Sequence, residues 1–203
     1  MKSIVRKVLI AVLIGVILNS VRHSISLFGF HELFHTHGLH EATVSASSSE
    51  SPTEEQYAPN ENLEPVDESL LHHASDHVDI AMYAFTDRRL AEELVELARR
   101  GTKIRIYRDN DQFREEARRS SNVAQILAGN TNISIRVKGD RELMHLKAWC
   151  DGSLLREGSA NWSVSGEKYQ DNTLFVLRDQ QSINAFERKF NQMWSRTDNQ
   201  IVQ

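Results

Sequence analysis

A strand–helix–strand succession in the middle of the chain restricts its fold more than any other feature of the sequence. Val78–Phe85 is apolar enough for a strand that is buried on both faces. A helix is expected after it, capped by Thr86 and ended by Gly101, and Lys103–Tyr107 then alternates as a second strand. Strands and helices that alternate with short links predict an α/β fold, in which helices cover the faces of a sheet.

The remainder of the chain continues this alternation. Asp151-Gly152 is a strong signal for a two-residue hairpin turn, so antiparallel strands are expected beside the parallel pair. The sequence therefore predicts a mixed β-sheet flanked by helices. The further expected elements are helical structure over 113–127 with a break near 120–122, strands over 133–137, 144–150, 153–156 and 173–177, and a last helix over 182–194 that turns Ile183, Phe186, Phe190 and Trp194 inward.

Residues 1–30 have the character of a signal peptide or a membrane anchor. Lys2, Arg6 and Lys7 precede an unbroken apolar run, Val8–Leu18, and a positive stretch before about 7–15 apolar residues is typical of a secretory signal. The run is short for a spanning helix, which needs about 20 apolar residues, and no clear cleavage site follows it. We therefore expect the N-terminal segment to contact a membrane and the protein to be exported, whether periplasmic, secreted or membrane-anchored.

Residues 31–69 differ in composition and are expected to form a disordered linker before a catalytic domain at residues 70–203. The stretch 41–66 is rich in Ser and Glu, lacks Lys and Arg, and is poor in large apolar residues. The net charge of −4 comes mainly from this stretch, so it says little about what the folded part binds. Zinc binding is an alternative role for four histidines at the start of the linker, namely His31, His35, His37 and His40.

One short segment, Met144–Ser163, carries the side chains that phosphodiester chemistry needs. His145 and Lys147 are two residues apart, so on a strand they point to the same face. A neutral imidazole is a nucleophile near pH 7, and a lysine cation with Ser and Asn donors stabilises the charge that builds on phosphate oxygens. A second group must protonate the leaving alkoxide, and one histidine cannot conveniently do both jobs at one phosphate.

This segment resembles the HKD motif of the phospholipase D superfamily, which is His-x-Lys, a spacer, Asp, six residues and then Gly-Ser-x-Asn. Upstream, residues 78–112 resemble the family's opening strand, helix, Arg-Gly turn and second strand. The resemblance covers about residues 70–195 and implies a phospholipase D-like fold with one motif in the chain. The matching positions are His145, Lys147, Asp151, Gly158, Ser159 and Asn161, and Glu167 and Asp171-Asn172 resemble the acidic and amide positions that often follow.

The spacer between Lys147 and Asp151 departs from the family pattern. It has three residues, Ala148–Cys150, where the family usually has four. Losing one residue from a strand reverses the facing of whatever follows. The relation between His145 and Lys147 is therefore expected to survive, and the change falls on Asp151 and on the register of the hairpin.

The resemblance implies a phosphodiester hydrolase that needs no metal and no cofactor. His145 would attack phosphorus and form a phosphohistidine. A second His145, from another subunit, would protonate the leaving group and later activate water. Because this chain has a single motif, the resemblance implies a homodimer with a shared active site.

The resemblance also assigns supporting roles to other residues of the motif. Lys147 and Asn161 would bind the nonbridging oxygens of the phosphate, helped by Ser159. Asp151 and Glu167 would orient or tune the histidines through hydrogen bonds.

The motif recognises a phosphate and does not identify the substrate. Residues 99–141 carry 11 basic side chains against five acidic ones, and a basic surface attracts nucleic acid. An endonuclease-like hydrolase of nucleic acid is therefore the leading hypothesis. A phospholipase D that acts on phosphatidylcholine or cardiolipin headgroups is the alternative, because a basic surface attracts anionic lipid too. A catalytically impaired module that only binds phosphate is the second alternative.

Overall fold

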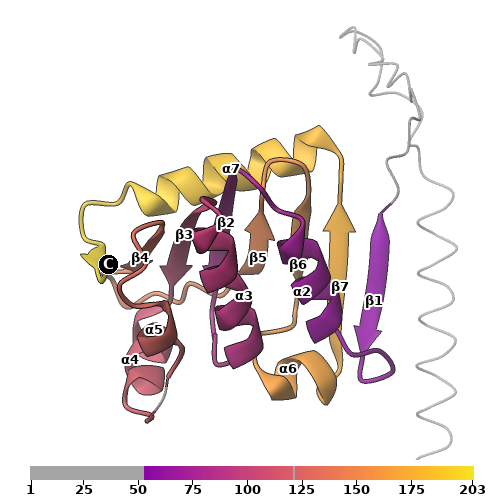
Figure 1. The fold of residues 1–203 in the computed structure, drawn as a ribbon, viewed down its shortest axis with the longest axis horizontal. Helices are drawn as coiled ribbons and strands as arrows, with labels where there is room; N and C mark the ends of the chain where they lie inside the picture. The colour runs from indigo at the N-terminus through magenta and orange to yellow at the C-terminus, as the bar shows by residue number, and fades with distance from the viewer. Residues whose placement is uncertain (1–52, 121) are drawn as a thin grey trace, which may run out of the picture. The chain divides into compact units, whose positions relative to one another are not determined.

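The computed structural model describes residues 53–120 and 122–203 of the chain (Figure 1). The expected signal or anchor at residues 1–30 and the four histidines proposed for zinc lie outside these ranges. Within them, no helix has both the length and the apolar character needed to cross a membrane.

The described strands form one mixed sheet, in the order β1-β7-β6-β5-β2-β3-β4-β8 (Figure 1). β2, β3 and β4 run parallel to one another, and the other neighbouring pairs are antiparallel. The expected mixed α/β sheet is therefore confirmed. The strands are β1 Glu54–Ala58, β2 His77–Met82, β3 Lys103–Arg108, β4 Ile133–Val137, β5 Lys147–Cys150, β6 Leu155–Gly158, β7 Asn172–Leu177 and β8 Gln200–Ile201.

Helices cover both faces of the sheet. α2, α3 and α5 pack side by side over one face with α4 next to α5, and α7 crosses the other face (Figure 1). The break expected near residues 120–122 separates α4 from α5. The helices are α2 Glu64–His72, α3 Arg88–Arg99, α4 Asn110–Ala117, α5 Val123–Leu127, α6 Val164–Lys168 and α7 Gln180–Trp194.

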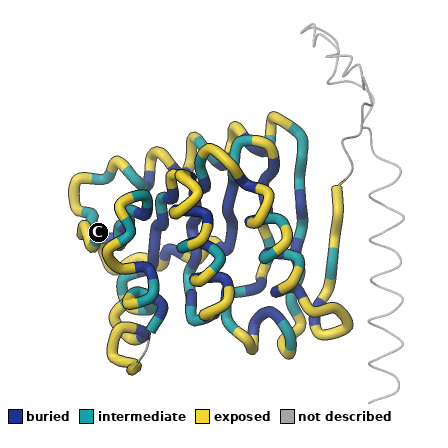
Figure 2. Tube along the Cα trace, in the orientation of Figure 1, coloured by how far each residue is buried: buried dark blue, intermediate teal, exposed yellow. Residues whose placement is uncertain are grey.

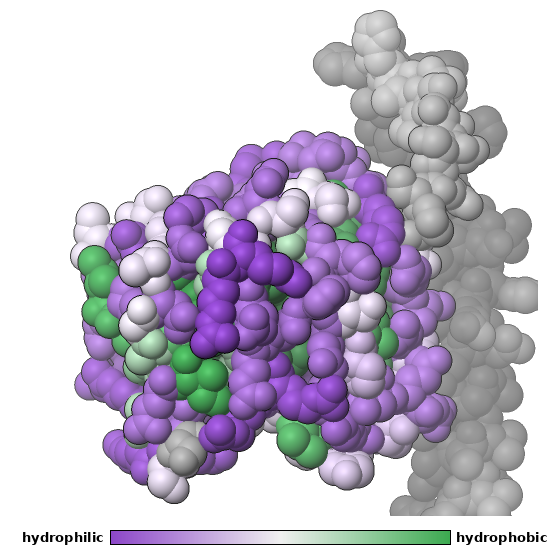
Figure 3. Space-filling model, viewed as in Figure 1, coloured by the Kyte–Doolittle hydropathy of each residue, from purple (hydrophilic) through white to green (hydrophobic). Residues whose placement is uncertain are grey.

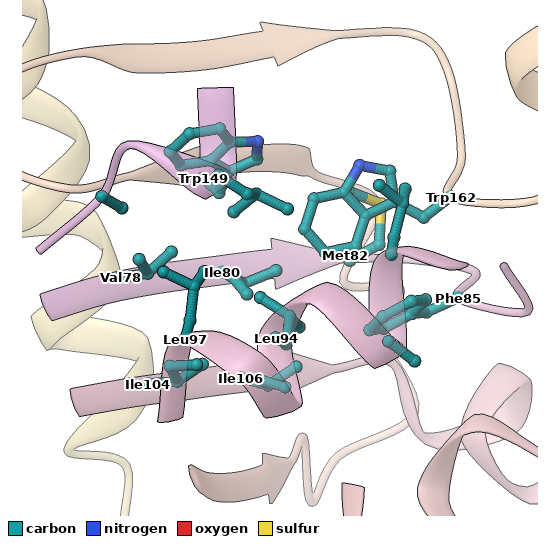
Figure 4. Close-up of a cluster of buried hydrophobic side chains, with 14 of the residues drawn as sticks. Val78, Ile80, Met82, Phe85, Leu94, Leu97, Ile104, Ile106, Trp149 and Trp162 are labelled. Carbon is teal, nitrogen blue, oxygen red and sulfur yellow. The ribbon is translucent and has the colours of Figure 1, made fainter. Parts of the chain in front are cut away.

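Alternation along the strands divides the core into two layers, because successive side chains of a strand point to opposite faces. Ile80 and Ile106 pack against Leu94 and Leu97 of α3, with Trp149 in the same layer (Figure 4). On the other face, small and aromatic strand residues meet the apolar stripe of α7. This second layer contains Ala81, Tyr107, Ala148 and Cys150 from the strands and Ile183, Phe186, Phe190 and Met193 from α7.

The beginning of α3 differs from the expectation at one residue. Asp87, and not Thr86, is the N-cap: its Oδ1 accepts hydrogen bonds from the backbone N–H groups of Arg89 (2.9 Å) and Leu90 (3.2 Å). A carboxylate also suits the positive end of the helix dipole better than a hydroxyl group does.

The expected linker is corrected over its last part, since β1 and α2 lie inside it. β1 pairs along its whole length with β7 at the edge of the sheet. The strand is mostly exposed, while the central strands are buried (Figure 2). Leu63 and Leu71 are fully buried where α2 packs on α3. This stretch therefore forms an edge strand and a helix, and the molecular surface on the side of α2 and α3 is largely hydrophilic (Figure 3).

Candidate active site

The ends of four strands that are distant in sequence lie next to one another along one edge of the sheet. This edge, the active-site edge, runs across the strand ends and differs from the outer edge formed by β1. β2 ends there at Met82, and β5, which is antiparallel to it, begins there at Lys147. β6 reaches the same edge at Gly158, and β7 leaves it at Asn172. The residues that follow or precede these strand ends therefore converge, which explains why a motif spread over the sequence forms one site.

His145 lies at this edge, directly before β5, and is exposed. The expectation that it belongs to the strand is corrected. Its ring packs edge-on against Tyr83, with the ring centroids 4.6 Å apart. Two grooves meet at His145, one of about 420 Å³ and one of about 310 Å³. The imidazole is thus accessible from both sides, as a nucleophile or proton donor requires.

Lys147 is the first residue of β5, and only 6% of it is exposed. Its Nζ donates to the backbone carbonyl of His145 (2.7 Å) and lies 4.7 Å from the centre of the Tyr83 ring. Burial lowers the pKa of the Lys147 ammonium from 10.5 to about 8. The group is therefore mostly charged at neutral pH but is poorly neutralised, which favours an incoming anion.

Asn161 is oriented so that its amide N–H groups are left for a ligand. Its Oδ1 accepts a hydrogen bond from the backbone N–H of Ala84 (3.3 Å). In the part of the chain that the structure describes, no partner is found for its Nδ2. The backbone of Trp162, the next residue, forms an isolated β-bridge with Phe85, and the two rings pack edge to face with their centroids 4.9 Å apart. These contacts fix the turn beside the end of β2.

Ser159 lies at the same edge, but its hydroxyl group is used within the chain. It donates to Asn172 Oδ1 (2.8 Å) and accepts from the backbone N–H of Thr173 (2.9 Å). Gly158 precedes it, and a Cβ there would lie 2.1 Å from the carbonyl oxygen of Thr173. Gly158 and Ser159 therefore fix the approach of β6 to β7, and the expected help of Ser159 in binding phosphate stays a prediction.

Asp151 lies at the opposite edge of the sheet. The four residues of β5, about 13 Å of strand, separate it from the other motif residues. Its Oδ1 accepts from the backbone N–H groups of Ser153 (2.8 Å) and Leu154 (3.0 Å), which closes the turn of the hairpin. Gly152 in this turn has a φ of +85°, and a Cβ there would lie 3.2 Å from the ring of His77, at the start of β2. Asp151 therefore makes no contact with His145 within one chain, and the expectation that it orients the histidines stays a prediction.

The three residues of the shortened spacer, Ala148–Cys150, all lie in β5, and Asp151 begins the turn at the distant end of this strand. On the active-site side, Lys147 is opposite Met82 and Ala148 is opposite Glu157 in regular ladders. The strands are joined by four residues, 151–154, and not by the expected two. The pairing of β5 is therefore regular, with β2 from Lys147 to Cys150 and with β6 from Ala148 to Cys150, and the relation between His145 and Lys147 is not disturbed by the short spacer.

Glu167 is fully buried and does not reach the surface of the site. Its Oε1 lies 3.6 Å from Arg156 Nη2, and neither carboxyl oxygen has a hydrogen-bond partner among the described residues. Burial, together with the charge of Asp67, raises the pKa of Glu167 to about 8. Glu167 therefore does not contact His145 directly within one chain. Its expected role in tuning a histidine through a hydrogen bond stays a prediction.

Three residues of the site surroundings are missed by sequence reasoning. Asp109 accepts a hydrogen bond from the backbone N–H of Met144 (2.9 Å) just before His145. Arg108 donates to the carbonyl of Met82 (2.8 Å) and is ion-paired with Glu116 (2.7 Å). Glu116 in turn accepts a hydrogen bond from the backbone N–H of Phe85 (3.0 Å), so each buried charge holds backbone near the active-site edge. The sequence signal for Arg108 and Asp109 is that they end or directly follow an apolar strand, and Glu116, in α4, has no such signal.

The described residues contain no group of three or more His, Cys, Asp or Glu side chains that could hold a metal ion. The site consists of an imidazole, a partly desolvated ammonium group and an amide at one edge of a mixed sheet. These features together define a class of α/β proteins built to act on a phosphate group.

Comparison with known proteins gives the family. Residues 68–194 match the family model described as "Cardiolipin synthase, PLD-like domain". The chain therefore belongs to the phospholipase D superfamily, whose members include phosphodiester hydrolases.

The curated relatives include the mitochondrial cardiolipin hydrolase of Chlamydomonas reinhardtii, which is 29% identical over 60% of this chain and 52% of its own length. The chain thus spans about half the length of this relative. Among solved structures, Nuc from Salmonella typhimurium, a phospholipase D family member, has a TM-score of 0.64 and 17% identity over 75% of this chain and 98% of its own. NucT from Helicobacter pylori has a TM-score of 0.62 and 22% identity over 70% of this chain and 95% of its own. Both structural likenesses confirm the fold.

Proposed function

We propose that this chain is a metal-independent phosphodiester hydrolase that uses His145 as its nucleophile. The observation that carries the proposal is the arrangement at one sheet edge of an exposed His145, the partly desolvated Lys147 ammonium and the free amide of Asn161. A ring nitrogen of His145 attacks phosphorus, and the bond from phosphorus to the leaving alkoxide breaks. Lys147 and Asn161 stabilise the negative charge on the nonbridging oxygens during this step.

The two proton transfers need a second imidazole, and we assign it to a second copy of the chain. His145 of the partner subunit protonates the leaving alkoxide. It then removes a proton from water, which attacks the phosphohistidine, breaks the phosphorus–nitrogen bond and releases the product. The exposure of His145 at the meeting point of two grooves supports a homodimer whose two-fold axis passes near this residue.

Nucleic acid is the first candidate substrate, although the support differs from that expected. The basic side chains of residues 99–141 are dispersed, and several are ion-paired: Arg99 with Glu96, Arg105 with Asp79, Arg108 with Glu116 and Arg119 with Glu115. Two cations from outside this range, Lys189 and Arg196, line the larger groove beside His145, together with Lys138, which is ion-paired with Asp140 (2.8 Å). The smaller groove contains Phe175, whose ring offers a stacking surface for a base.

A phospholipid headgroup is the second candidate substrate. Leu143 and Leu146 are 60% and 37% exposed, and both line the larger groove with its cations. An apolar surface next to cations suits an anionic amphiphile. The name of the relatives as cardiolipin hydrolases is consistent with this candidate. We also propose that residues 1–30 bring the enzyme to a membrane or export it, which a fluorescent fusion of the full chain compared with one lacking residues 1–30 would test.

The test compares the full-length chain with His145→Ala in the presence of EDTA. The substrates are bis(p-nitrophenyl) phosphate, single- and double-stranded DNA, RNA, phosphatidylcholine and cardiolipin. His73→Ala is the matched control, because His73 is exposed and bonds only the carbonyl of Ser69. We expect the parent and the control to cleave at equal rates and His145→Ala to be inactive. A folded, dimeric parent that cleaves none of these would leave the phosphate-binding module as the function.

A further inference from the structure

Arg156 lies behind the active-site edge and joins it to helix α2. Its side chain is fully buried. Nη2 donates to Asp67 Oδ2 (2.6 Å), and Nη1 donates to the backbone carbonyl of Lys147 (3.1 Å). A guanidinium group is suited to this task, because it presents several N–H donors in one rigid plane.

The carbonyl of Lys147 depends on Arg156 because of its place in the sheet. The carbonyl of Leu146 accepts from the backbone N–H of Tyr83 (2.9 Å), so it points toward β2. Successive carbonyls of a strand point in opposite directions, so the carbonyl of Lys147 points toward β6. The β5–β6 ladder begins only with the Ala148–Glu157 pair. The carbonyl of Lys147 lies just outside this ladder, and Arg156 supplies the hydrogen bond that it accepts.

The guanidinium group is itself held in place. The second carboxyl oxygen of Asp67 accepts a hydrogen bond from Trp149 Nε1 (2.8 Å), so Asp67 is fixed from two sides. Glu167 lies 3.6 Å away on the same nitrogen of Arg156. Trp149, Arg156, Asp67 and Glu167 are all fully buried. These four residues have no role in the proposed proton transfers, yet one of them, Arg156, hydrogen-bonds the backbone of Lys147, which carries the active-site cation.

We propose that Arg156, held by Asp67, is a positioning residue that fixes the Lys147 ammonium at the phosphate. The inference rests on the proposed function, because it concerns the placement of a group in that reaction. Lys147 also donates to the carbonyl of His145, so a shift at its backbone is passed on to the nucleophile. A displacement of about 1 Å at a reacting group is enough for a rate loss of about 100-fold.

Arg156→Lys tests this role against Arg105→Lys as a matched control. Both arginines are strand residues of the same sheet that pair with an aspartate: Arg156 with Asp67 of α2, and Arg105 with Asp79 of β2, through Nε (2.7 Å) on the face that carries α7. Lysine keeps the charge but lacks the planar fork that bonds two partners at once. The full-length proteins are compared by kcat and KM for bis(p-nitrophenyl) phosphate. In parallel, acetylation of the Lys147 amine is followed against pH by mass spectrometry.

We expect Arg156→Lys to lower kcat by about tenfold or more with KM within about threefold. We also expect the pH profile of Lys147 acetylation to move, with no change in either readout for Arg105→Lys. A folded Arg156→Lys variant with the parent's kcat and acetylation profile overturns the proposal, as does an equal loss in both variants. If Arg156→Lys does not fold, Asp67→Asn, which keeps the size and one acceptor oxygen, carries the same expectations.

The two readouts separate this proposal from the proposed function. A parent that hydrolyses nothing, while Arg156→Lys alone moves the acetylation profile, refutes the hydrolase and supports the positioning role. An active parent with an unchanged Arg156→Lys variant refutes the positioning role and leaves the hydrolase standing.

Discussion

Replacing Lys147 by Met is predicted to make the protein more stable and inactive at the same time. Burial lowers the pKa of this ammonium from 10.5 to about 8. Such a difference corresponds to about 3 kcal/mol of cost for the charged form. Lys147 also borders the smaller groove, so part of its hydration is retained, and we expect a net cost of about 1–2 kcal/mol. Methionine has a similar length and carries no charge, so the cost is removed while the packing is kept.

The sign of the pH dependence follows from the protons bound in each state. Between about pH 8 and pH 10.5 the unfolded chain keeps a proton on Lys147 that the folded chain has released. The stability of the parent therefore rises with pH in this window, relative to the variant. At pH 7 both states of the parent are mostly protonated, so the full cost is present and Lys147→Met has its largest advantage.

Urea unfolding at about pH 7 and about pH 10 measures this prediction, with Lys189→Met as the control because Lys189 is an exposed lysine of the larger groove. We expect the gap in unfolding free energy between Lys147→Met and the parent to shrink by about 1–2 kcal/mol from the lower to the higher pH. The gap for Lys189→Met should not change. A gap that is the same at both pH values for Lys147→Met would refute the argument that a buried charge lowers the stability here.

The remaining predictions concern residues that sequence reasoning and the structure place differently. Glu167 has a pKa raised to about 8, so the folded chain keeps a proton that the unfolded chain releases at lower pH, and this contribution to stability is lost as pH rises through about 8. Glu167→Gln should remove this loss, which thermal melts across the pH range would show. An identical dependence of the melting temperature on pH in both proteins would contradict the prediction. Asp151→Ala should lower the unfolding free energy by about 1 kcal/mol, because it removes two hydrogen bonds between the Asp151 side chain and the backbone of the turn. We expect kcat for bis(p-nitrophenyl) phosphate to stay unchanged. A large fall in kcat with normal stability would show instead that Asp151 acts in catalysis. Gly158→Ala should reduce both stability and activity, since its Cβ would lie 2.1 Å from a carbonyl oxygen, and soluble, fully active protein would show that the sheet edge can shift.

Much of the fold can be predicted from the sequence because its signals are local. Val78–Phe85, Lys103–Tyr107 and Ile133–Val137 alternate or run apolar over lengths that suit strands, and the structure has a strand at each. His145, Lys147 and Asn161 come together at one edge, as the resemblance to a known motif implies.

The missed features depend on contacts between distant residues. Asp67 and Arg156 are 89 positions apart, and nothing local distinguishes either from a surface charge. The acidic residues of β1 and α2 favour a solvent-exposed linker, yet Glu64 is buried and ion-paired with Lys168 (2.6 Å). Asp151 illustrates the opposite case, because closeness in sequence to Lys147 does not mean closeness in space when a strand lies between them.

The turn at residues 151–154 has a practical consequence for recognising related proteins. It joins β5 to β6 at the edge that lies away from His145, Lys147 and Asn161. Adding or removing one residue there changes the reach of a surface loop and leaves the phosphate-binding edge in register. The spacer between the lysine and the aspartate, Ala148–Cys150, lies within strand β5. A search pattern that demands a fixed number of residues there therefore measures the length of one strand, and it would discard members of the superfamily in which that strand is one residue shorter at the end away from His145.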